Sequence, residues 1–212
     1  MAERSLQDSL HHGLLEIYGE EPGQAFTDAL LVYLELLERW NRTYNLTAVR
    51  DPSEMVSRHL LDSLSVSPWV GRGSLLDAGT GAGLPGVPLA IADSGLNVTL
   101  LDSSGKKIRF LNQVRRELGL ENIEPVQSRL ESFKREGVFD TVISRAFSSL
   151  TAFAAGARHL CRADTRLLAM KGRLPSQEIE ELPSWVRLEA IEKLSVPGLQ
   201  EDRHLVIMTV TL

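Results

Sequence analysis

The stretch of this sequence with the clearest chemistry is a run of glycines between two aspartates. The glycines Gly79, Gly81 and Gly83 stand at alternate positions. Asp77 precedes them, and Asp102 follows Gly81 by about 20 residues, the distance at which a ribose-binding acid is expected. Glycine lets a backbone adopt positive φ and approach a ligand closely, and the free N–H groups of a following helix favour an electronegative partner. These residues therefore predict a site for a nucleotide-like cofactor.

Two kinds of cofactor fit this turn. Gly81, Gly83 and Gly86 match the Gly-x-Gly-x-x-Gly pattern of dinucleotide-binding folds. Asp77 directly before the turn, the alternate glycines and a second strand ending at Asp102 instead resemble the first two motifs of class I methyltransferases, which implies S-adenosylmethionine. Asp102 would accept the ribose hydroxyls of either cofactor. A tight turn that needs glycine only for packing is the structural alternative.

The turn requires a strand before it and a helix after it. Residues 75–77 predict a buried strand, and residues 85–93 predict the helix. Further strands are expected at residues 98–102, 123–126, 139–144 and 166–170, with helices at 104–118 and 149–161. This alternation is typical of a parallel, doubly wound sheet. Residues 186–194 and 204–211 predict two closing strands, and their short link favours an antiparallel pair at the sheet edge.

Residues 1–70 predict an N-terminal helical subdomain packed on a Rossmann-like domain of residues 71–212. Apolar residues at helical spacing indicate two helices, at residues 6–18 and 24–42. The acidic residues on these helices would repel a phosphate backbone.

A third helix in this subdomain is expected to begin at Asp51 and Pro52, as N-cap and first helical residue. It carries His59 and Asp62, which are three residues apart and are expected to share a helix face. A hydrogen bond between His59 and Asp62 is the structural alternative to a role for His59 in chemistry.

Composition limits the class of protein. A net charge of −5 and a pI near 5.6 argue against a general nucleic-acid coat, so RNA binding would need a local basic face.

The single cysteine, Cys161, cannot form an internal disulfide, which fits a reducing cytoplasm, and it is expected to be a small core residue. No apolar run is long enough to span a bilayer. We expect a cytoplasmic protein without membrane contact or a metal site.

The densest basic patch is the candidate RNA contact. It consists of Lys106, Lys107, Arg109, Arg115 and Arg116. An electrostatic contact with RNA phosphates predicts a steep loss of binding with salt. The structural alternative is an ordinary solvated helix face.

Several motifs follow the predicted strands or lie in the N-terminal subdomain. They are Tyr44-Asn45-Leu46-Thr47, Arg58-His59-Leu60-Leu61-Asp62-Ser63-Leu64, Leu101-Asp102-Ser103-Ser104-Gly105-Lys106-Lys107, Ser144-Arg145-Ala146-Phe147, Met170-Lys171-Gly172 and Asp202-Arg203-His204. Together with the glycine turn they resemble the RsmG family, also called GidB, over nearly the whole chain from about Phe26. The resemblance implies a bacterial enzyme that uses S-adenosylmethionine to methylate N7 of one guanine near the decoding centre of 16S rRNA. It also implies the class I methyltransferase fold, a doubly wound and mostly parallel seven-stranded sheet with an N-terminal helical subdomain.

The resemblance also implies the residues that line the cofactor site. They are Asp77, Gly79, Thr80, Gly81, Gly83, Leu84, Asp102, Leu130, Glu131 and Arg145. Gly79 and Leu84 would line the methionine and ribose part, and Leu130 and Glu131 would border the adenine. Core packing is the alternative for the two leucines, and a surface acid is the alternative for Glu131.

Guanine N7 already carries an in-plane lone pair, so its methylation requires no general base. The enzyme must align N7 with the methyl carbon, exclude water and tolerate the positive charge that develops on the purine. The positioning candidates are Arg145, Lys171, Asn45 and His59, with Asp62 nearby and Phe147 as a stacking surface. Arg203 and His204 are candidates for contact with an RNA phosphate, or else cap a strand.

Two other functions use the same glycine turn. One is an NAD(P)-dependent oxidoreductase, and the other is a nucleotide-binding regulatory protein without catalysis. The expected partner of the methyltransferase is 16S rRNA, as naked RNA, in a partly assembled particle or in the complete small ribosomal subunit. We expect the protein to be a monomer.

Overall fold

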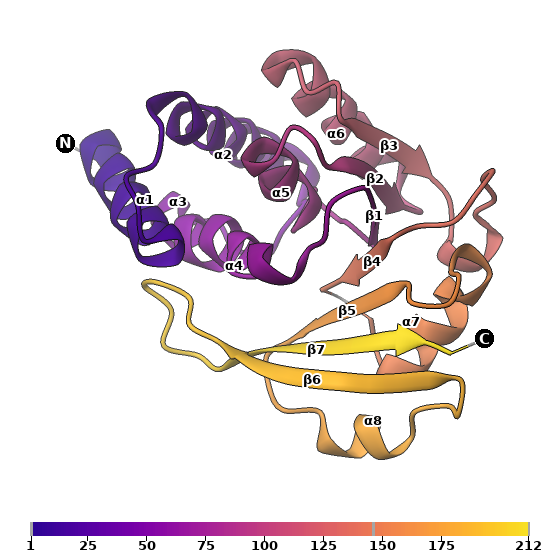
Figure 1. The fold of residues 1–212 in the computed structure, drawn as a ribbon. Helices are drawn as coiled ribbons and strands as arrows, with labels where there is room; N and C mark the ends of the chain where they lie inside the picture. Colours follow the sequence, from indigo (N-terminus) through magenta and orange to yellow (C-terminus); the bar gives the residue numbers. More distant parts are fainter. Residues whose placement is uncertain (1, 146, 212) are drawn as a thin grey trace.

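The computed structural model describes residues 2–145 and 147–211, so Ala146 of the Ser144–Phe147 motif lies outside it. Within these residues one sheet has seven strands in the order β3-β2-β1-β4-β5-β7-β6 (Figure 1). The strands are β1 (Ser74–Ala78), β2 (Asn97–Asp102), β3 (Ile123–Gln127), β4 (Thr141–Ser144), β5 (Arg166–Lys171), β6 (Val186–Leu194) and β7 (Arg203–Val210). The first five pair in parallel, which confirms the predicted doubly wound sheet.

The last two strands form the predicted antiparallel pair, with β7 inside and β6 at the edge. β7 pairs antiparallel with both β5 and β6. Residues Leu205–Met208 of β7 are all buried, whereas burial in β6 alternates between its two faces. A continuous apolar run suits a strand covered on both faces, and alternation suits an edge strand. Because β7 runs opposite to β5, its first residues lie beside the carboxyl end of β5.

Helices cover both faces of the sheet. They are α1 (Ala2–Tyr18), α2 (Gln24–Tyr44), α3 (Pro52–Met55), α4 (Asp62–Leu64), α5 (Gly86–Ala92), α6 (Gly105–Leu118), α7 (Leu150–Ala157) and α8 (Ser176–Glu180). Short 3-10 turns occupy Ser67–Trp69, Leu130–Ser132 and Arg158–Leu160. The sequence did not predict α8, which has no fully buried residue and so no apolar face to detect. Among the described residues no helix combines the length and apolarity needed to cross a membrane.

The N-terminal helices share a core with the sheet. Leu30 and Leu37 of α2 belong to the same buried cluster as Ile143 of β4. The Tyr33 hydroxyl of α2 donates a 2.7 Å hydrogen bond to the carbonyl of Ala82 in the glycine turn. These contacts tie α2 to the sheet, and the division of the chain at residue 70 stays a prediction.

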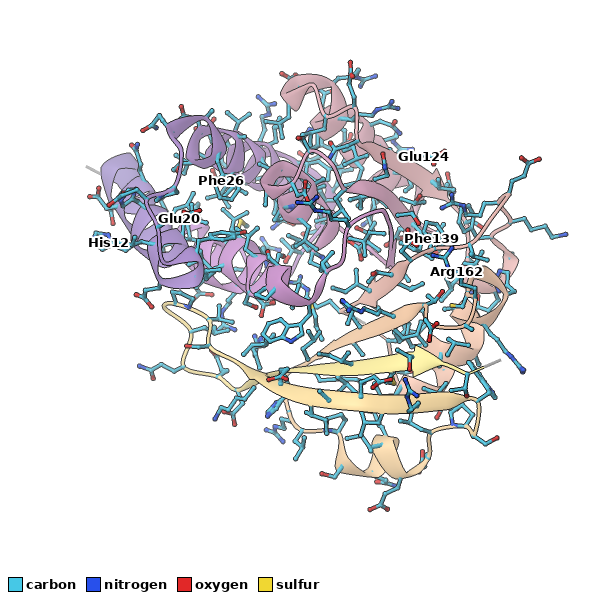
Figure 2. The ribbon with its side chains drawn as sticks, in the orientation of Figure 1. His12, Glu20, Phe26, Glu124, Phe139 and Arg162 are labelled. Atoms are coloured by element: carbon cyan, nitrogen blue, oxygen red, sulfur yellow. The ribbon has the colours of Figure 1, made fainter. Side chains whose placement is uncertain are left out.

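The outer side of these helices faces solvent. Figure 2 labels His12 on α1 and Glu20 in the link between α1 and α2, and both residues are exposed. Phe26, also on the N-terminal helices, is partly buried and packs on the core.

The helix that begins at Pro52 was predicted to be a single helix, but its middle part is not α-helical. Asp51 caps it as predicted, because its carboxylate accepts a 2.9 Å hydrogen bond from the Ser53 N–H. Residues Val56–Leu61, however, form a π-helix between α3 and α4. The hydrogen bonds of a π-helix join residues five apart, so its turn is wider than an α-helical turn. Side chains three residues apart, such as those of His59 and Asp62, are therefore not brought together as they would be in an α-helix. The two side chains instead bond to different partners.

The glycine turn packs against its own strand through Gly86, the first residue of α5. A Cβ on Gly86 would lie 2.8 Å from Asp77 Oδ2 and closer still to Leu100 Cδ2. We expect Gly86→Ala to lower the free energy of unfolding by about 2 kcal/mol, because overpacking forces buried atoms apart. Gly71→Ala is the matched control, since its Cβ would meet only Arg166 Nη1 at 3.8 Å. Urea unfolding of both variants measures the difference, and equal stabilities would contradict the packing role of Gly86.

Candidate functional site

The glycines of the turn divide into two groups. Gly79, Gly81 and Gly83 all have positive φ, at +73°, +63° and +97°. A Cβ on Gly83 would lie 2.5 Å from Val87 Cγ2, so this position needs glycine for packing as well. A Cβ on Gly79 or Gly81 would meet no atom closer than 3.9 Å. Gly79 and Gly81 therefore leave open space beside the backbone, where a ligand can approach.

Asp77 is completely buried beneath this turn. Its Oδ2 accepts hydrogen bonds from the Thr80 hydroxyl at 2.6 Å and from the Gly86 N–H at 2.8 Å. Its Oδ1 is buried and has no hydrogen-bond partner among the described residues. Burial raises the pKa of Asp77 to about 6, although these hydrogen bonds and the Arg145 charge oppose the shift. Asp77 therefore supports the turn from beneath and is not itself exposed to a ligand.

Asp102 lies beside the turn because β1 and β2 pair in parallel, with Ala78 opposite Leu101. Its Oδ2 accepts 3.0 Å hydrogen bonds from the Gly81 N–H and from Lys107 Nζ. Its Oδ1 accepts a 2.8 Å hydrogen bond from the Ser104 N–H. Asp102 thus joins the turn to the start of α6.

A hollow of about 310 Å³ opens beside these residues, and we call it the glycine-turn pocket. Its lining consists of Gly79, Leu101, Asp102, Ser103, Lys107, Ser128, Arg129, Leu130, Glu131 and Phe147. The pocket therefore brings together four of the predicted cofactor residues, Gly79, Asp102, Leu130 and Glu131. Leu84 does not line it and is buried in the core instead.

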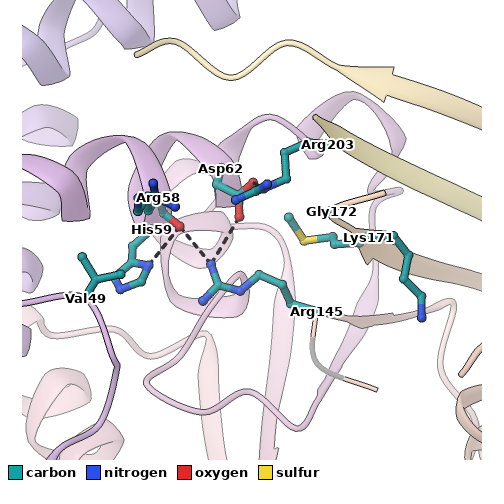
Figure 3. A pocket seen from close by; sticks show the side chains of 9 residues that line it. Val49, Arg58, His59, Asp62, Arg145, Lys171, Gly172 and Arg203 are labelled. Atoms are coloured by element: carbon teal, nitrogen blue, oxygen red, sulfur yellow. Dashed lines mark hydrogen bonds and ion pairs between the residues drawn. The ribbon is translucent and has the colours of Figure 1, made fainter. Parts of the chain in front are cut away.

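A second hollow, of about 320 Å³, lies at the carboxyl ends of β4 and β5, and we call it the arginine pocket (Figure 3). Its lining consists of Val49, Arg58, His59, Asp62, Arg145, Met170, Lys171, Gly172 and Arg203. Three of the four predicted positioning residues, Arg145, Lys171 and His59, meet here. The fourth, Asn45, is exposed, bonds to Arg50 and lines neither pocket.

Asp62 joins two arginines in the arginine pocket. Its Oδ2 accepts from Arg145 Nη1 at 3.3 Å, and its Oδ1 accepts from Arg203 Nε at 3.1 Å. Arg145 Nη1 also donates to the carbonyl of Arg58 at 3.1 Å. Burial raises the pKa of Asp62 from its usual value, despite the opposing effect of both arginines.

His59 is an uncharged side chain that forms part of the wall of the arginine pocket. Its Nδ1 lies 2.9 Å from the carbonyl of Arg58, and its Nε2 lies 2.9 Å from Thr47 Oγ1. A carbonyl only accepts, so Nδ1 carries the proton and Nε2 accepts from the Thr47 hydroxyl. Burial, helped by the Arg145 charge, lowers the pKa of His59 to about 4. Both ring nitrogens are therefore engaged, and the ring is uncharged at neutral pH.

The two pockets are neighbours along one segment of chain. Arg145 follows β4 and lines the arginine pocket, while Phe147 lines the glycine-turn pocket. The charge of Arg145 acts on the pKa of Asp77 as well as on those of Asp62 and His59. Arg145 is therefore electrostatically linked both to the wall of the arginine pocket and to the acid beneath the glycine turn.

The predicted RNA-binding residues are distributed over several environments. Lys107 Nζ is bound to Asp102 in the glycine-turn pocket, and Lys106 Nζ donates a 2.8 Å hydrogen bond to the carbonyl of Tyr44. Arg109, Arg115 and Arg116 are exposed on α6. The buried Nδ1 of His204 has no partner among the described residues. Their contact with RNA stays a prediction.

The sequence analysis missed the contacts that two residues make at the glycine turn. Lys107 was predicted to bind RNA. It lies in the first turn of α6, only five residues after Asp102, and this short separation could have suggested their ion pair. Tyr33 lies far from the turn in sequence, and only the packing of α2 brings its hydroxyl to Ala82. Among the described residues no group of His, Cys, Asp and Glu is arranged to hold a metal ion.

Comparison with known proteins identifies the family of this chain. The model of the GidB family, described as rRNA small subunit methyltransferase G, matches residues 27–206. The chain belongs to this family. Ribosomal RNA small subunit methyltransferase G of Alkalilimnicola ehrlichii is 53% identical over 209 residues, covering 99% of this chain and 94% of that protein. The protein of the same name from Pseudomonas aeruginosa strain UCBPP-PA14 is 57% identical over 183 residues, covering 86% of each chain.

Solved structures of lower identity show the fold of this RsmG-family chain. The glycopeptide N-methyltransferase MtfA, complexed with S-adenosylmethionine, has a TM-score of 0.62 at 14% identity, covering 73% of this chain and 88% of that one. A SAM-dependent methyltransferase from Aquifex aeolicus has a TM-score of 0.59 at 18% identity, covering 78% and 97%. The expected class I methyltransferase fold is confirmed.

The buried Asp77 predicts a characteristic dependence of stability on pH. A raised pKa means that the folded state holds the Asp77 proton more tightly than the unfolded state does. The stability that Asp77 contributes is therefore greatest below pH 3.8 and is lost as the pH rises to about 6. Asparagine does not titrate, so Asp77→Asn should gain about 3 kcal/mol relative to the unsubstituted protein across this window.

The measurement is urea unfolding of both proteins, without cofactor, at several pH values across this window. Other titrating groups cancel in the difference between the two proteins. A difference that stays constant with pH would contradict the raised pKa of Asp77.

Proposed function

We propose that this chain transfers the methyl group of S-adenosylmethionine to N7 of one guanine in 16S rRNA, near the decoding centre. Membership of the rRNA small subunit methyltransferase G family is the observation that carries this proposal. Two pockets at the carboxyl edge of the sheet support it, because a methyl transferase must hold a cofactor and a target side by side.

The residues of the glycine-turn pocket fit S-adenosylmethionine. Gly79 and Gly81 leave room for close approach, and Asp102 offers a carboxylate to the ribose hydroxyls. Asp77 holds the turn in place from beneath, through the Thr80 hydroxyl and the Gly86 N–H. Leu130 and Phe147 add apolar surface for a flat base. When bound, the cofactor supplies the electrophilic methyl group.

The arginine pocket supplies positioning groups and needs no general base. N7 attacks with its own lone pair, so the protein must align it, exclude water and stabilise the product charge. His59, with a pKa of about 4 and both nitrogens engaged, suits this chemistry as a fixed part of the wall. Arg145 and Lys171 are the candidates for contact with the guanine nucleotide.

We further propose that the protein acts in the cytoplasm as a monomer. An rRNA substrate supports that compartment. Cys161 is buried, its thiol donates to the carbonyl of Ala157, and burial raises its pKa to about 12. A thiol of this kind is a core residue that does not join two copies of the chain through a disulfide.

The deciding experiment maps N7-methylguanosine in 16S rRNA from cells that lack this protein. We expect one guanine near the decoding centre to lose its methyl group and to regain it when the wild-type gene is returned. A gene carrying Asp102→Ala should fail to restore it. Retention of every N7-methylguanosine in the deleted strain would refute the proposal. Titration of the pure protein with S-adenosylmethionine and with NADH separates a methyltransferase from an oxidoreductase.

The adjacent residues Lys106 and Lys107 separate cofactor binding from RNA binding. We expect Lys107→Met to weaken binding of S-adenosylmethionine about tenfold, because Asp102 loses a charged hydrogen-bond partner. Lys106→Met should leave cofactor binding unchanged, since Lys106 contacts only the carbonyl of Tyr44. If Lys106 contacts RNA phosphate, its loss should reduce the slope of log K against log salt by about 1.

Calorimetry with the cofactor and filter binding with 16S rRNA measure the two effects. The prediction for Lys107 is wrong if Lys107→Met keeps its cofactor affinity and changes only the salt dependence of RNA binding.

A further inference from the structure

The arginine pocket has cationic side chains in its lining that are not all neutralised. Arg58 pairs with Glu54 and Glu201, and Lys171 pairs with Glu178, but Arg145 and Arg203 share the single carboxylate of Asp62. The whole chain, in contrast, carries a net charge of −5. Cations gathered in a hollow create a positive potential that attracts an anion.

The two arginines that bind Asp62 keep unused hydrogen-bond donors. A guanidinium has five N–H donors and no acceptor. Arg145 bonds only through Nη1, and Arg203 bonds through Nε and Nη1. Within residues 2–145 and 147–211, Nε and Nη2 of Arg145 and Nη2 of Arg203 therefore have no acceptor. Their side chains are 27% and 20% exposed, so a ligand in the pocket can reach them.

Asp62 holds these arginines together from two distant parts of the chain. Arg145 follows β4 and Arg203 begins β7, and the two guanidinium groups would repel each other without the carboxylate between them. The side chain of Asp62 is only 4% exposed, and each of its oxygens already accepts from one arginine. Asp62 has little capacity left to accept hydrogen bonds from a ligand.

This arrangement favours a phosphate over the guanine base as the ligand of the pocket. The N1 and N2 edge of guanine presents donors and needs a free acceptor, which Asp62 does not offer. A phosphate presents only acceptors, which match the unused guanidinium N–H groups in charge and geometry.

We propose that the arginine pocket binds a phosphate group of the RNA nucleotide that is methylated. Arg145 and Arg203 donate to the phosphate oxygens, and Asp62 is a positioning residue that holds both guanidinium groups in place. The identity of the phosphate as part of rRNA rests on the proposed function. The affinity of the pocket for phosphate does not, so the two can fail separately.

The test follows the arginine Nε–Hε signals in NMR spectra while inorganic phosphate, GMP or guanosine is added. Inorganic phosphate and GMP should shift the signals of Arg145 and Arg203 in a saturable way. Guanosine and sodium chloride of the same ionic strength should not shift them. The proposal is overturned if guanosine shifts these signals as GMP does, or if phosphate leaves them unchanged.

Variants distinguish a specific site from a general positive potential. Arg203→Met should weaken GMP binding about tenfold or more, the effect of losing a charged hydrogen bond. Arg203→Lys should recover only part of this loss, because it restores the charge without the guanidinium fork. Lys193→Met is the control, since Lys193 of β6 forms an exposed ion pair with Asp202, the residue before β7. Equal effects of Arg203→Met and Lys193→Met would contradict the site.

Asp62→Asn tests the positioning role through the sign of its effect. Removal of a negative charge by itself should strengthen anion binding, whereas loss of the group that holds both arginines should weaken it. We expect weaker GMP binding together with unchanged affinity for S-adenosylmethionine, which also shows that the variant is folded. Stronger GMP binding would overturn the role of Asp62. Failure of the unsubstituted protein to methylate rRNA, with phosphate binding intact, would count against the proposed function alone.

Discussion

The close approach of the glycine turn to the carboxylate of Asp77 is the contact on which the rest of the site depends. Asp77 Oδ2 holds the turn at both ends, through the Thr80 hydroxyl and the Gly86 N–H. Helix α5 can come this near to β1 only because Gly86 lacks a side chain, and the absence of a side chain at Gly83 leaves room for Val87 of α5 and Leu111 of α6. The same approach leaves Asp77 Oδ1 buried with no partner among the described residues, which costs stability.

Arg145 connects this turn to the second pocket. Its guanidinium donates to Asp62 and to the carbonyl of Arg58 in the arginine pocket, while Phe147, two residues later, lines the glycine-turn pocket. Burial raises the pKa of Asp77 and Asp62, and the Arg145 charge opposes that rise because it favours neighbouring anions. Burial also lowers the pKa of His59, and the same charge adds to this shift because it disfavours a neighbouring cation. Arg145 thus acts on titratable groups beneath the glycine turn and in the arginine pocket.

The π-helical segment Val56–Leu61 explains how the N-terminal part of the chain contributes to the site. His59 turns toward Thr47, and Asp62 turns toward Arg145 and Arg203. π-helical turns are rare in proteins overall, but those that occur often lie at functional sites, where they change the direction in which side chains point. The loop between β6 and β7 also meets this segment, through the ion pair of Arg58 with Glu201.

Local patterns in the sequence were sufficient for the sheet, the glycine turn and the position of Asp102. Strands and turns are determined by residues that are close together in the sequence. Parallel pairing then brings the carboxyl ends of β1 and β2 to the same edge of the sheet. The resemblance to the RsmG family rested on the same short motifs. Tertiary structure alone decided that Asp62 binds two arginines instead of His59, and that the Tyr33 hydroxyl reaches Ala82. Those contacts join residues from separate elements, and their partners are chosen by packing and by the need to pair buried charges, which no local spacing encodes.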